Sequence, residues 1–209
     1  QAVRKLFTEA QRTVQCHRRC CDALLRLLSK HKSAWDEYLA CLSRILVVSK
    51  RDPGVERLVQ FVMLLAASGA LLDRTVEFLL TRSAAADKAV RFRCCQLLGG
   101  MMTEYSQRFH VQEEEIDRVV DVLLPRLQDK ASGDHRRNIV AGVRVQAVAA
   151  LRPFQFVLEE DEDEAALQED RVRAELMRAM MSDSSPDVRQ AALVAVDKTV
   201  GMLDQASGE

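Results

Sequence analysis

The fold is decided by one stretch of the chain, VRFRCCQLLGGM at residues 90–101. Side chains four, seven, eight and eleven positions after Val90 share one face of a helix, because an α-helix has 3.6 residues per turn. The dipeptide Val-Arg opens two more segments in the same register, at Val143 and Val188. The three sets of side chains that share a face in this way are Cys94, Leu97, Leu98 and Met101; Ala147, Ala150, Leu151 and Phe154; and Ala192, Ala195, Val196 and Thr199.

A looser fourth copy of the pattern begins at Val55, with Glu56 in the position of the arginine. The four valines are separated by 35, 53 and 45 residues, and HEAT-type helix pairs repeat about every 40 to 47 residues. A helix that recurs in register has to stack on its own copies to bury its apolar face. The sequence therefore predicts an all-α fold, a curved HEAT-repeat α-solenoid of about four to five helix pairs. Such a fold is typical of a binding surface rather than of an enzyme.

The composition favours helices throughout. Apolar residues make up 48% of the 209 residues, enough for a sizeable core, whereas glycine and proline are sparse, at 8 and 4. The longest apolar stretch, residues 61–72, is broken by Ser68 and Gly69, and it is shorter than the roughly 20 residues of a membrane span. The chain begins with Gln1 and ends in a polar tail. We therefore expect residues 1–209 to be part of a longer solenoid.

Start and stop signals divide the chain into helices and loops. Ser33 and Ser185 precede apolar segments as caps, and Pro53 and Pro186 stand where a missing backbone N–H costs nothing. We expect residues 130–142 and 159–169 to be flexible loops, because the first is polar with two glycines and the second begins with an acidic run. The expected helices are one or two within 1–32, then 34–49, 53–67, 70–81, 90–105, 112–128 with a kink at Pro125, 143–153, 165–181 and 186–202.

Charge is unevenly distributed along a chain whose net charge is −1. Residues 1–51 carry eleven Lys and Arg against four Asp and Glu, and residues 111–170 carry seven against fifteen. A basic region beside an acidic one can orient a molecule on a polyanion while the whole chain stays soluble. The same distribution also fits charged residues that only coat the outer helices, and composition does not separate the two.

The six cysteines are typical of buried thiols in a protein from a reducing compartment. The run Cys16–Cys21 (CHRRCC) invites a zinc interpretation, but a structural zinc site needs a second close pair of ligands, which Cys41 and the pair at 94–95 do not supply. The acidic run at 159–164 lacks the glycine-containing loop of a calcium site. The sequence contains no phosphate-binding glycine loop and no HExxH motif. We therefore expect no metal, no other cofactor and no enzymatic activity.

Three segments contain residues that a generic HEAT-repeat pattern does not require. They are Val47–Arg57 (VVSKRDPGVER), Lys88–Leu98 (KAVRFRCCQLL), and Arg126–Lys130 (RLQDK) followed after a loop by Val143–Val148 (VRVQAV). In this order and spacing they resemble the N-terminal part of the CAP-G family, the HEAT-repeat non-SMC subunit 3 of condensin. The turn at Asp183–Arg189 fits the same family, and the resemblance covers most of the chain from about Phe7 onward.

The resemblance implies a non-catalytic subunit of condensin, a complex that acts in mitotic chromosome condensation. It implies that a basic groove of the solenoid binds double-stranded DNA without sequence specificity. The kleisin subunit (CAP-H type) would bind in the same groove and link it to the ATP-hydrolysing SMC subunits. It also implies a protein of the nucleus and chromosomes, with a cytoplasmic pool outside mitosis. Neither a membrane nor a small-molecule substrate is expected.

DNA binding of this kind needs Lys and Arg side chains on one surface, where they reach phosphates without reading bases. Lys50 and Arg51 are the first candidates, because they stand together in an expected turn and match the family's basic pair, although any exposed turn favours charged residues. Arg93 is a further candidate. Arg91 is another, but it can instead pair with an aspartate of the next repeat. The loop at 130–142 adds two more arginines, Arg136 and Arg137.

A different class of function shares the same periodicity. A HEAT-repeat protein-binding scaffold, of the transport-receptor or phosphatase-scaffold type, would bind a peptide or a partner helix in its groove and no DNA. The basic pair Lys50 and Arg51, together with the segments that resemble condensin, favours DNA binding. A groove lined mainly by acidic or apolar residues would favour the scaffold.

Overall fold

The computed structural model describes residues 1–48, 52–66, 72–106, 113–129, 137–155 and 164–206, and beside several of the gaps it describes the backbone alone. Over these residues the protein consists of helices, with no strand. The chain forms two compact units, Gln1–Phe109 and His110–Glu209. No helix in the described ranges is long and apolar enough to cross a lipid bilayer. The all-α fold predicted from the sequence is confirmed.

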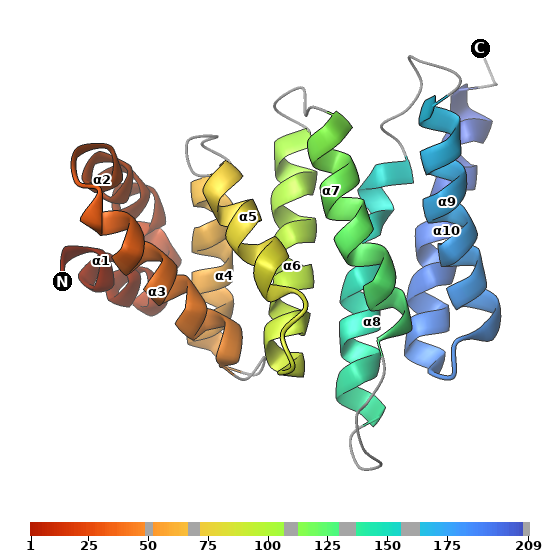
Figure 1. The fold of residues 1–209 in the computed structure, drawn as a ribbon, viewed down its shortest axis with the longest axis horizontal. Helices are drawn as coiled ribbons and strands as arrows, with labels where there is room; N and C mark the ends of the chain where they lie inside the picture. The colour runs from red at the N-terminus through yellow and green to blue at the C-terminus, as the bar shows by residue number, and fades with distance from the viewer. Residues whose placement is uncertain (49–51, 67–71, 107–112, 130–136, 156–163, 207–209) are drawn as a thin grey trace. The chain divides into compact units, whose positions relative to one another are not determined.

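Figure 1 labels the α-helices along the chain. The short 3-10 helices, which the figure does not label, are named η1 to η3. The first unit contains α1 (Ala2–Arg12), η1 (Val14–Cys16), α2 (His17–Lys30), α3 (Ser33–Val47), α4 (Pro53–Ala66), α5 (Leu72–Arg82) and α6 (Lys88–Ser106). The second unit contains α7 (Glu113–Leu123), η2 (Leu124–Gln128), α8 (Arg137–Leu151), η3 (Arg152–Gln155), α9 (Glu164–Ser182) and α10 (Pro186–Ala206).

Consecutive helices pack as antiparallel pairs, and the second helix of a pair carries the repeated valine and its stripe. Contacts join α3 to α4, α5 to α6, α7 to α8 and α9 to α10, as in the helix pairs of a HEAT-type solenoid. The four valines are 0–7% exposed. The copy that begins at Val55 has Val59, Val62, Met63 and Ala66 in its stripe. Of the stripe residues whose side chains are described, Met63 is half-buried and the others are buried, which confirms the predicted register.

Helix α6 is the centre of the first unit. It contacts α3, α4 and α5, and buried side chains lie on nearly every side of it between Val90 and Met101. Such a helix has no fully polar face to turn toward water. Two arginines in its first turns, Arg91 and Arg93, are therefore buried along with the apolar residues, at 9% and 1% exposed.

An aromatic cluster ties the first helices of this unit together. The ring of Phe7 on α1 lies edge-on to Phe61 of α4, with centroids 5.3 Å apart and planes at 89°, and 6.0 Å from Tyr38 of α3. The imidazole of His17 on α2 lies 5.5 Å from the Phe61 ring. The hydroxyl of buried Tyr38 hydrogen-bonds to that of Thr75 on α5 over 2.9 Å. Edge-on aromatic contacts of this kind add to the stabilisation that burial alone provides.

Two of the expected loops are shorter than predicted. Helix α8 begins at Arg137, so residues 137–142 of the expected loop 130–142 are helical. The physical reason is Val140, which is 3% exposed and extends the buried stripe one turn back from Val143. Helix α9 begins at Glu164, so residues 164–169 of the expected loop 159–169 are helical too, where Ala and Leu are strong helix formers. The remaining residues of both loops lie outside the described ranges.

The helix-start predictions have mixed outcomes. α4 begins at Pro53, and Pro186 opens α10, as expected. α7 ends just before Pro125 and continues as η2, because proline cannot donate the next i→i−4 hydrogen bond, so the predicted kink is confirmed. The predicted cap at Ser33 is wrong. Ser33 is itself the first helical residue, and the cap residue Lys32 makes no side-chain cap bond.

All six cysteines are buried free thiols, as the sequence predicts. In the run Cys16–Cys21, the thiol of Cys16 donates to the carbonyls of Glu9 and Thr13, at 3.2 and 3.1 Å, and His17 Nε2 lies 2.9 Å from the carbonyl of Ala10. These contacts are local packing contacts. Within the described ranges, no three His, Cys, Asp or Glu side chains gather as metal ligands would.

Burial of the thiols makes the protein sensitive to alkali. Burial raises the pKa of Cys21 and that of Cys94, each from 9.0 to about 12. The folded state therefore holds these protons more tightly than the unfolded chain. This tighter binding of protons stabilises the folded state fully below pH 9, and the stabilisation is lost as the pH rises toward 12. We expect urea unfolding under reducing conditions to show a falling free energy of unfolding from pH 9 upward.

The matched variants are Cys94→Ala and Leu97→Ala, because both remove a fully buried side chain of α6. Both lower stability at pH 8. Only Cys94→Ala should flatten the decline above pH 9, because it removes a titrating group. Parallel pH profiles for the two variants would contradict the assignment.

Candidate functional site

A groove of about 180 Å³ runs between α1, α3 and α4 in the first unit. Its floor is apolar, because the buried stripes of the three helices meet there. Two exposed arginines stand at it, Arg4 from α1 and Arg44 from the last turns of α3. Its lining residues are Arg4, Phe7, Thr8, Gln11, Cys41, Arg44, Ile45, Val48, Asp52, Val55 and Leu58.

The charges of the two arginines both reach the thiol of Cys41, which lines the groove. Burial raises the pKa of the Cys41 thiol. The positive charge of Arg44 lowers this pKa, the negative charge of Glu37 raises it, and the positive charge of Arg4 lowers it. Neither guanidinium has a hydrogen-bond acceptor or an ion-pair partner in the described part of the chain. An unpaired pair of cations over an apolar floor is suited to an anionic ligand.

The start of α4 closes one end of this groove. The carboxylate of Asp52 accepts the backbone N–H of Gly54 over 2.8 Å and so caps the helix. A Cβ atom on Gly54 would lie 2.8 Å from Gln11 Nε2 and 2.9 Å from its Cγ, so the close approach of α4 to α1 favours glycine. Arg57 Nε donates to the Gln11 carbonyl over 2.6 Å and holds the same two helices together.

The first DNA-binding candidates, Lys50 and Arg51, lie outside the described residues. The described residues on either side of them, Val48 and Asp52, both line the groove. The chain therefore enters and leaves the predicted basic turn at the groove that Arg4 and Arg44 flank. Sequence reasoning missed these two arginines, because 40 positions separate them and only the packing of α1 on α3 brings them together.

Two other candidates are engaged inside the protein. Arg91 Nη1 donates to the carbonyls of Ala85 and Ala86, at 2.9 and 2.7 Å, in the turn before its own helix. Arg93 Nη1 donates to Glu56 Oε1 over 2.8 Å and to Gln96 Oε1 over 2.6 Å. We therefore correct the expectation that they reach phosphates, because their guanidinium groups serve the packing of the first unit.

The two loop candidates are less well described. Arg136 lies outside the described residues. Arg137 is the first residue of α8, and only its backbone is described.

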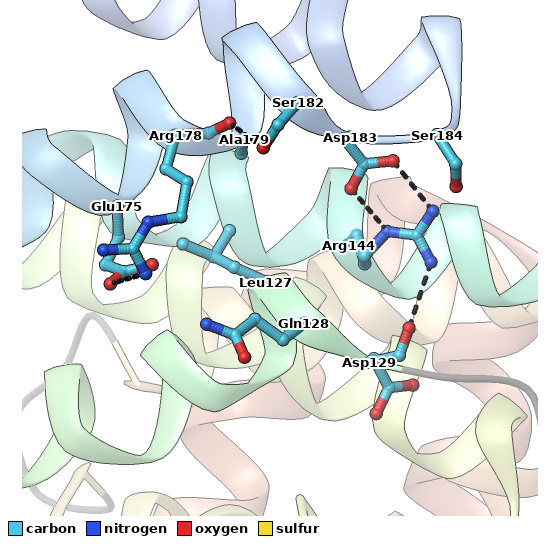
Figure 2. Close-up of a pocket in the computed structure, with 10 residues that line it drawn as sticks. All are labelled: Leu127, Gln128, Asp129, Arg144, Glu175, Arg178, Ala179, Ser182, Asp183 and Ser184. Carbon is cyan, nitrogen blue, oxygen red and sulfur yellow. Dashed lines mark hydrogen bonds and ion pairs between the residues drawn. The ribbon is translucent and has the colours of Figure 1, made fainter.

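The second unit has a larger groove, of about 350 Å³, between the end of η2 and the last turns of α9 (Figure 2). Its lining mixes both charges with polar and apolar groups. Arg178 pairs with Glu175 over 2.7 Å at one end of the groove, and Arg144 lies at the other. The residues that line it are Leu127, Gln128, Asp129, Arg144, Glu175, Arg178, Ala179, Ser182, Asp183 and Ser184.

Arg144 locks one helix pair onto the next in this unit. Its Nε and Nη2 donate to the two carboxylate oxygens of Asp183, at 2.8 and 2.9 Å, and its Nη1 donates to the carbonyl of Asp129 over 3.0 Å. The Arg144 and Asp183 side chains are 12% and 9% exposed. Asp183 also accepts the backbone N–H of Ser185 over 2.8 Å. A bidentate arginine–carboxylate pair is geometrically specific as well as strong.

The repeated Val-Arg dipeptide now has a structural explanation. Arg91 and Arg189 each donate to a backbone carbonyl in the turn that precedes their own helix, and Arg144 donates to the carbonyl of Asp129, the residue that follows η2. The carbonyls belong to Ala85 and Ala86 for Arg91, to Asp129 for Arg144, and to Asp183 for Arg189, at 2.7 Å. In each copy the valine fills the core and the arginine holds a backbone carbonyl of a segment earlier in the chain. Arg144 adds a partner in the next helix pair, the arrangement that sequence reasoning proposed for Arg91.

Comparison with curated proteins finds condensin complex subunit 3 from three organisms. The sequence is 26% identical to the Xenopus laevis protein, 28% to the Homo sapiens protein and 27% to the Schizosaccharomyces pombe protein. The three alignments cover 99%, 83% and 92% of the present chain, respectively. These matches cover 20%, 17% and 21% of the relatives, so the chain spans about a fifth of their length. No protein-family model matches the chain. The predicted resemblance to condensin subunit 3 is confirmed.

Proposed function

We propose that this chain is part of a non-catalytic condensin subunit that binds double-stranded DNA in mitotic chromosome condensation. The observation that carries the proposal is the similarity to condensin complex subunit 3 of three distant organisms, over 83–99% of the chain. Stacked helix pairs without a strand in the described ranges are consistent with it. The partners we propose are duplex DNA, a kleisin subunit of the CAP-H type and, through it, the SMC subunits. The location we propose is the nucleus and chromosomes.

The groove between α1, α3 and α4 supports phosphate binding at this end of the protein. Arg4 and Arg44 are exposed, and the residues that precede and follow Lys50 and Arg51 line the same groove. Arg4 and Arg44, together with Lys50 and Arg51 from the segment whose flanking residues line the groove, would neutralise several phosphates and release their counterions, which is the main source of affinity in non-specific DNA binding. Arginines that reach phosphates read no bases, and aromatic residues are only 5% of the chain. We therefore propose binding without sequence preference.

The test is fluorescence anisotropy of a labelled DNA duplex across a salt series, with the full-length subunit bound to its kleisin partner. Two charge-reversal pairs probe the groove, Lys50→Glu/Arg51→Glu and Arg4→Glu/Arg44→Glu. Each should weaken binding about tenfold or more at low salt. Each should also make the slope of log affinity against log salt shallower by about 0.9 for every phosphate that the variant no longer neutralises. The matched control is Arg26→Glu/Lys30→Glu, which changes the same charge on exposed residues of α2, a helix that does not line the groove.

The outcomes separate three interpretations. A loss of affinity confined to the groove variants supports phosphate binding there. An equal loss in the α2 control would mean that net charge, and not this groove, governs the affinity. If the wild-type complex binds no duplex at all, the proposal fails and the protein-binding scaffold becomes the better account.

A further inference from the structure

One hydroxyl group lines the groove that Arg4 and Arg44 flank. It belongs to Thr8 of α1, which is exposed, and no other described lining residue carries a hydroxyl. The hydroxyl donates to the carbonyl of Arg4 over 3.0 Å, a bond that threonines inside helices can form. In the described part of the chain its oxygen accepts no hydrogen bond. The oxygen is therefore accessible and is not held by a second partner.

The surroundings of this hydroxyl are positive. Thr8 and Arg4 are four residues apart on one helix, so their side chains share a face, with Cβ atoms about 5–6 Å apart. Arg44 reaches the same groove from α3. The carboxylate among the described lining residues, that of Asp52, is engaged with the backbone N–H of Gly54. A phosphate group on Thr8 would therefore meet two guanidinium groups that have no other partner in the described residues.

The residues before Thr8 are also basic. Arg4 and Lys5 stand four and three positions before it, and both are exposed. Protein kinases choose their substrates by such charge patterns, and basic residues here suit a kinase whose substrate groove is acidic. Thr81 on α5 is the matched exception. It too is exposed, and its hydroxyl donates to the carbonyl of Phe78 over 2.8 Å, but an acidic and an aromatic residue replace the two basic ones.

We propose that Thr8 is a phosphorylation site, and that its phosphate binds Arg4 and Arg44 and so keeps DNA phosphates out of the groove. In the reaction the Thr8 oxygen bonds to the γ-phosphorus of ATP, the bond from that phosphorus to the β,γ-bridging oxygen breaks, and ADP leaves. The hydroxyl proton passes to the catalytic aspartate of the kinase. The effect on DNA rests on the proposed function, whereas the binding of the phosphate by the arginines does not.

The charges explain why the two ligands exclude each other. A phosphothreonine carries about −1.5 to −2 charges at pH 7 and three acceptor oxygens, enough to neutralise both guanidinium groups and to hydrogen-bond to each. Neutralised arginines release no counterions when DNA approaches, and the added phosphate repels the DNA backbone. The modified protein should therefore bind DNA as weakly as the Arg4→Glu/Arg44→Glu variant.

The first test asks whether Thr8 accepts a phosphate. The full-length subunit bound to its kleisin partner is incubated with ATP and a kinase that prefers basic residues before the acceptor, and the modified residues are mapped by mass spectrometry. We expect Thr8 to be modified about tenfold or more faster than Thr81, and Arg4→Gln/Lys5→Gln to remove most of this advantage. Rates for the two threonines within about twofold of each other would overturn the modification site.

The second test follows the phosphate itself by phosphorus NMR, without DNA. In an unstructured phosphothreonine peptide the second pKa of the phosphate is about 6. We expect this pKa to be lower by about 0.5 or more at position 8, because guanidinium groups favour the dianion, although the carboxylates of Asp52 and Glu37 act against them. Arg4→Gln/Arg44→Gln should return the pKa toward that of the peptide. An unshifted pKa without these substitutions would overturn the contact between phosphate and arginines.

The third test measures duplex binding by the same anisotropy assay. Phosphorylation of Thr8 should weaken binding about tenfold or more at low salt and make the salt slope shallower. It should add little in the Arg4→Glu/Arg44→Glu background, where the arginines are gone. Thr81→Asp places a negative charge outside the groove and should change the affinity by less than about twofold.

The outcomes of this third test keep the two proposals apart. Unchanged affinity after phosphorylation, in a complex that binds duplex when unmodified, would overturn the block of DNA binding. If the unmodified complex binds no duplex, the proposed function fails and the block fails with it. The phosphorus resonance still decides in that case whether the arginines hold the phosphate.

Discussion

Arg144→Ala is expected to lower the free energy of unfolding of the second unit by about 3–5 kcal/mol, as removal of one partner of a buried ion pair does. The substitution leaves the Asp183 carboxylate, which is only 9% exposed, with a single backbone N–H donor among its described contacts. It also removes the donor to the Asp129 carbonyl. Both effects act at the junction between α8 and the α9–α10 pair.

The measurement should report on the second unit alone. The single tryptophan of the chain is at position 35, in the first unit, so its fluorescence is uninformative here. Hydrogen exchange followed by mass spectrometry on peptides of α8 and α10 gives the local stability instead. We expect protection in these peptides to fall while that of α3 and α4 is unchanged.

Two variants control this prediction. Arg171→Ala breaks an ion pair with Asp121 of the same 2.8 Å length, but its partners are 45% and 63% exposed, so the destabilisation should stay below about 1 kcal/mol. The double variant Arg144→Met/Asp183→Leu replaces the pair with apolar groups and should recover much of the stability. If Arg144→Ala proves no more harmful than Arg171→Ala, the buried pair contributes little.

Phe61→Ala is the second large effect, with an expected destabilisation of about 3–5 kcal/mol in the first unit. The Phe61 ring is fully buried, lies edge-on to the Phe7 ring and also contacts the imidazole ring of His17. Truncation therefore removes both its own buried surface and the contacts that join α1, α2 and α4. The surrounding helices can refill the cavity only in part.

Urea unfolding followed by Trp35 fluorescence measures this effect, because Trp35 packs 6.0 Å from Tyr38 in the same aromatic cluster. Val47→Ala serves as the control, since Val47 is 57% exposed and should change stability by no more than about 0.5 kcal/mol. Phe61→Leu should destabilise less than Phe61→Ala, because a leucine side chain fills part of the site. A smaller effect for alanine than for leucine would contradict a cavity mechanism.

The helical stripes could be predicted because burial imposes the 3.6-residue period directly on the sequence. The start of α8 was not predicted, because the glycine at position 142 and the polar residues before it suggested a loop. Val140 was the available signal, since it precedes Val143 by three residues and shares its face.

The burial of Arg93 had a signal in the sequence that reasoning from single residues overlooked. Arg93 lies three positions after Val90, on the side of the apolar stripe. Glu56 is the one departure from Val-Arg among the four copies, and these two unusual residues form an ion pair over 2.8 Å. A charge on a core face calls for an opposite charge nearby in the fold, so the two anomalies predicted each other.

The groove flanked by Arg4 and Arg44 lay beyond sequence reasoning. Each arginine is an ordinary surface residue of its own helix, and only the packing of α1 against α3 and α4 brings them together. The electrostatic character of a surface depends on such long-range placement, whereas a stripe depends on neighbours within one helix.

The central place of α6 has a consequence for how the protein is made. Helices α3 and α4 contact α6 as well as α1 and α2, so the sides of α3 and α4 that face α6 stay uncovered on the ribosome until residues near Met101 have emerged. At synthesis rates of about 5–20 residues per second, the delay after α4 is complete lasts a few seconds. During that time the nascent chain exposes apolar surface that is prone to aggregation. The earliest helices of the first unit are therefore the segments for which a chaperone would matter most.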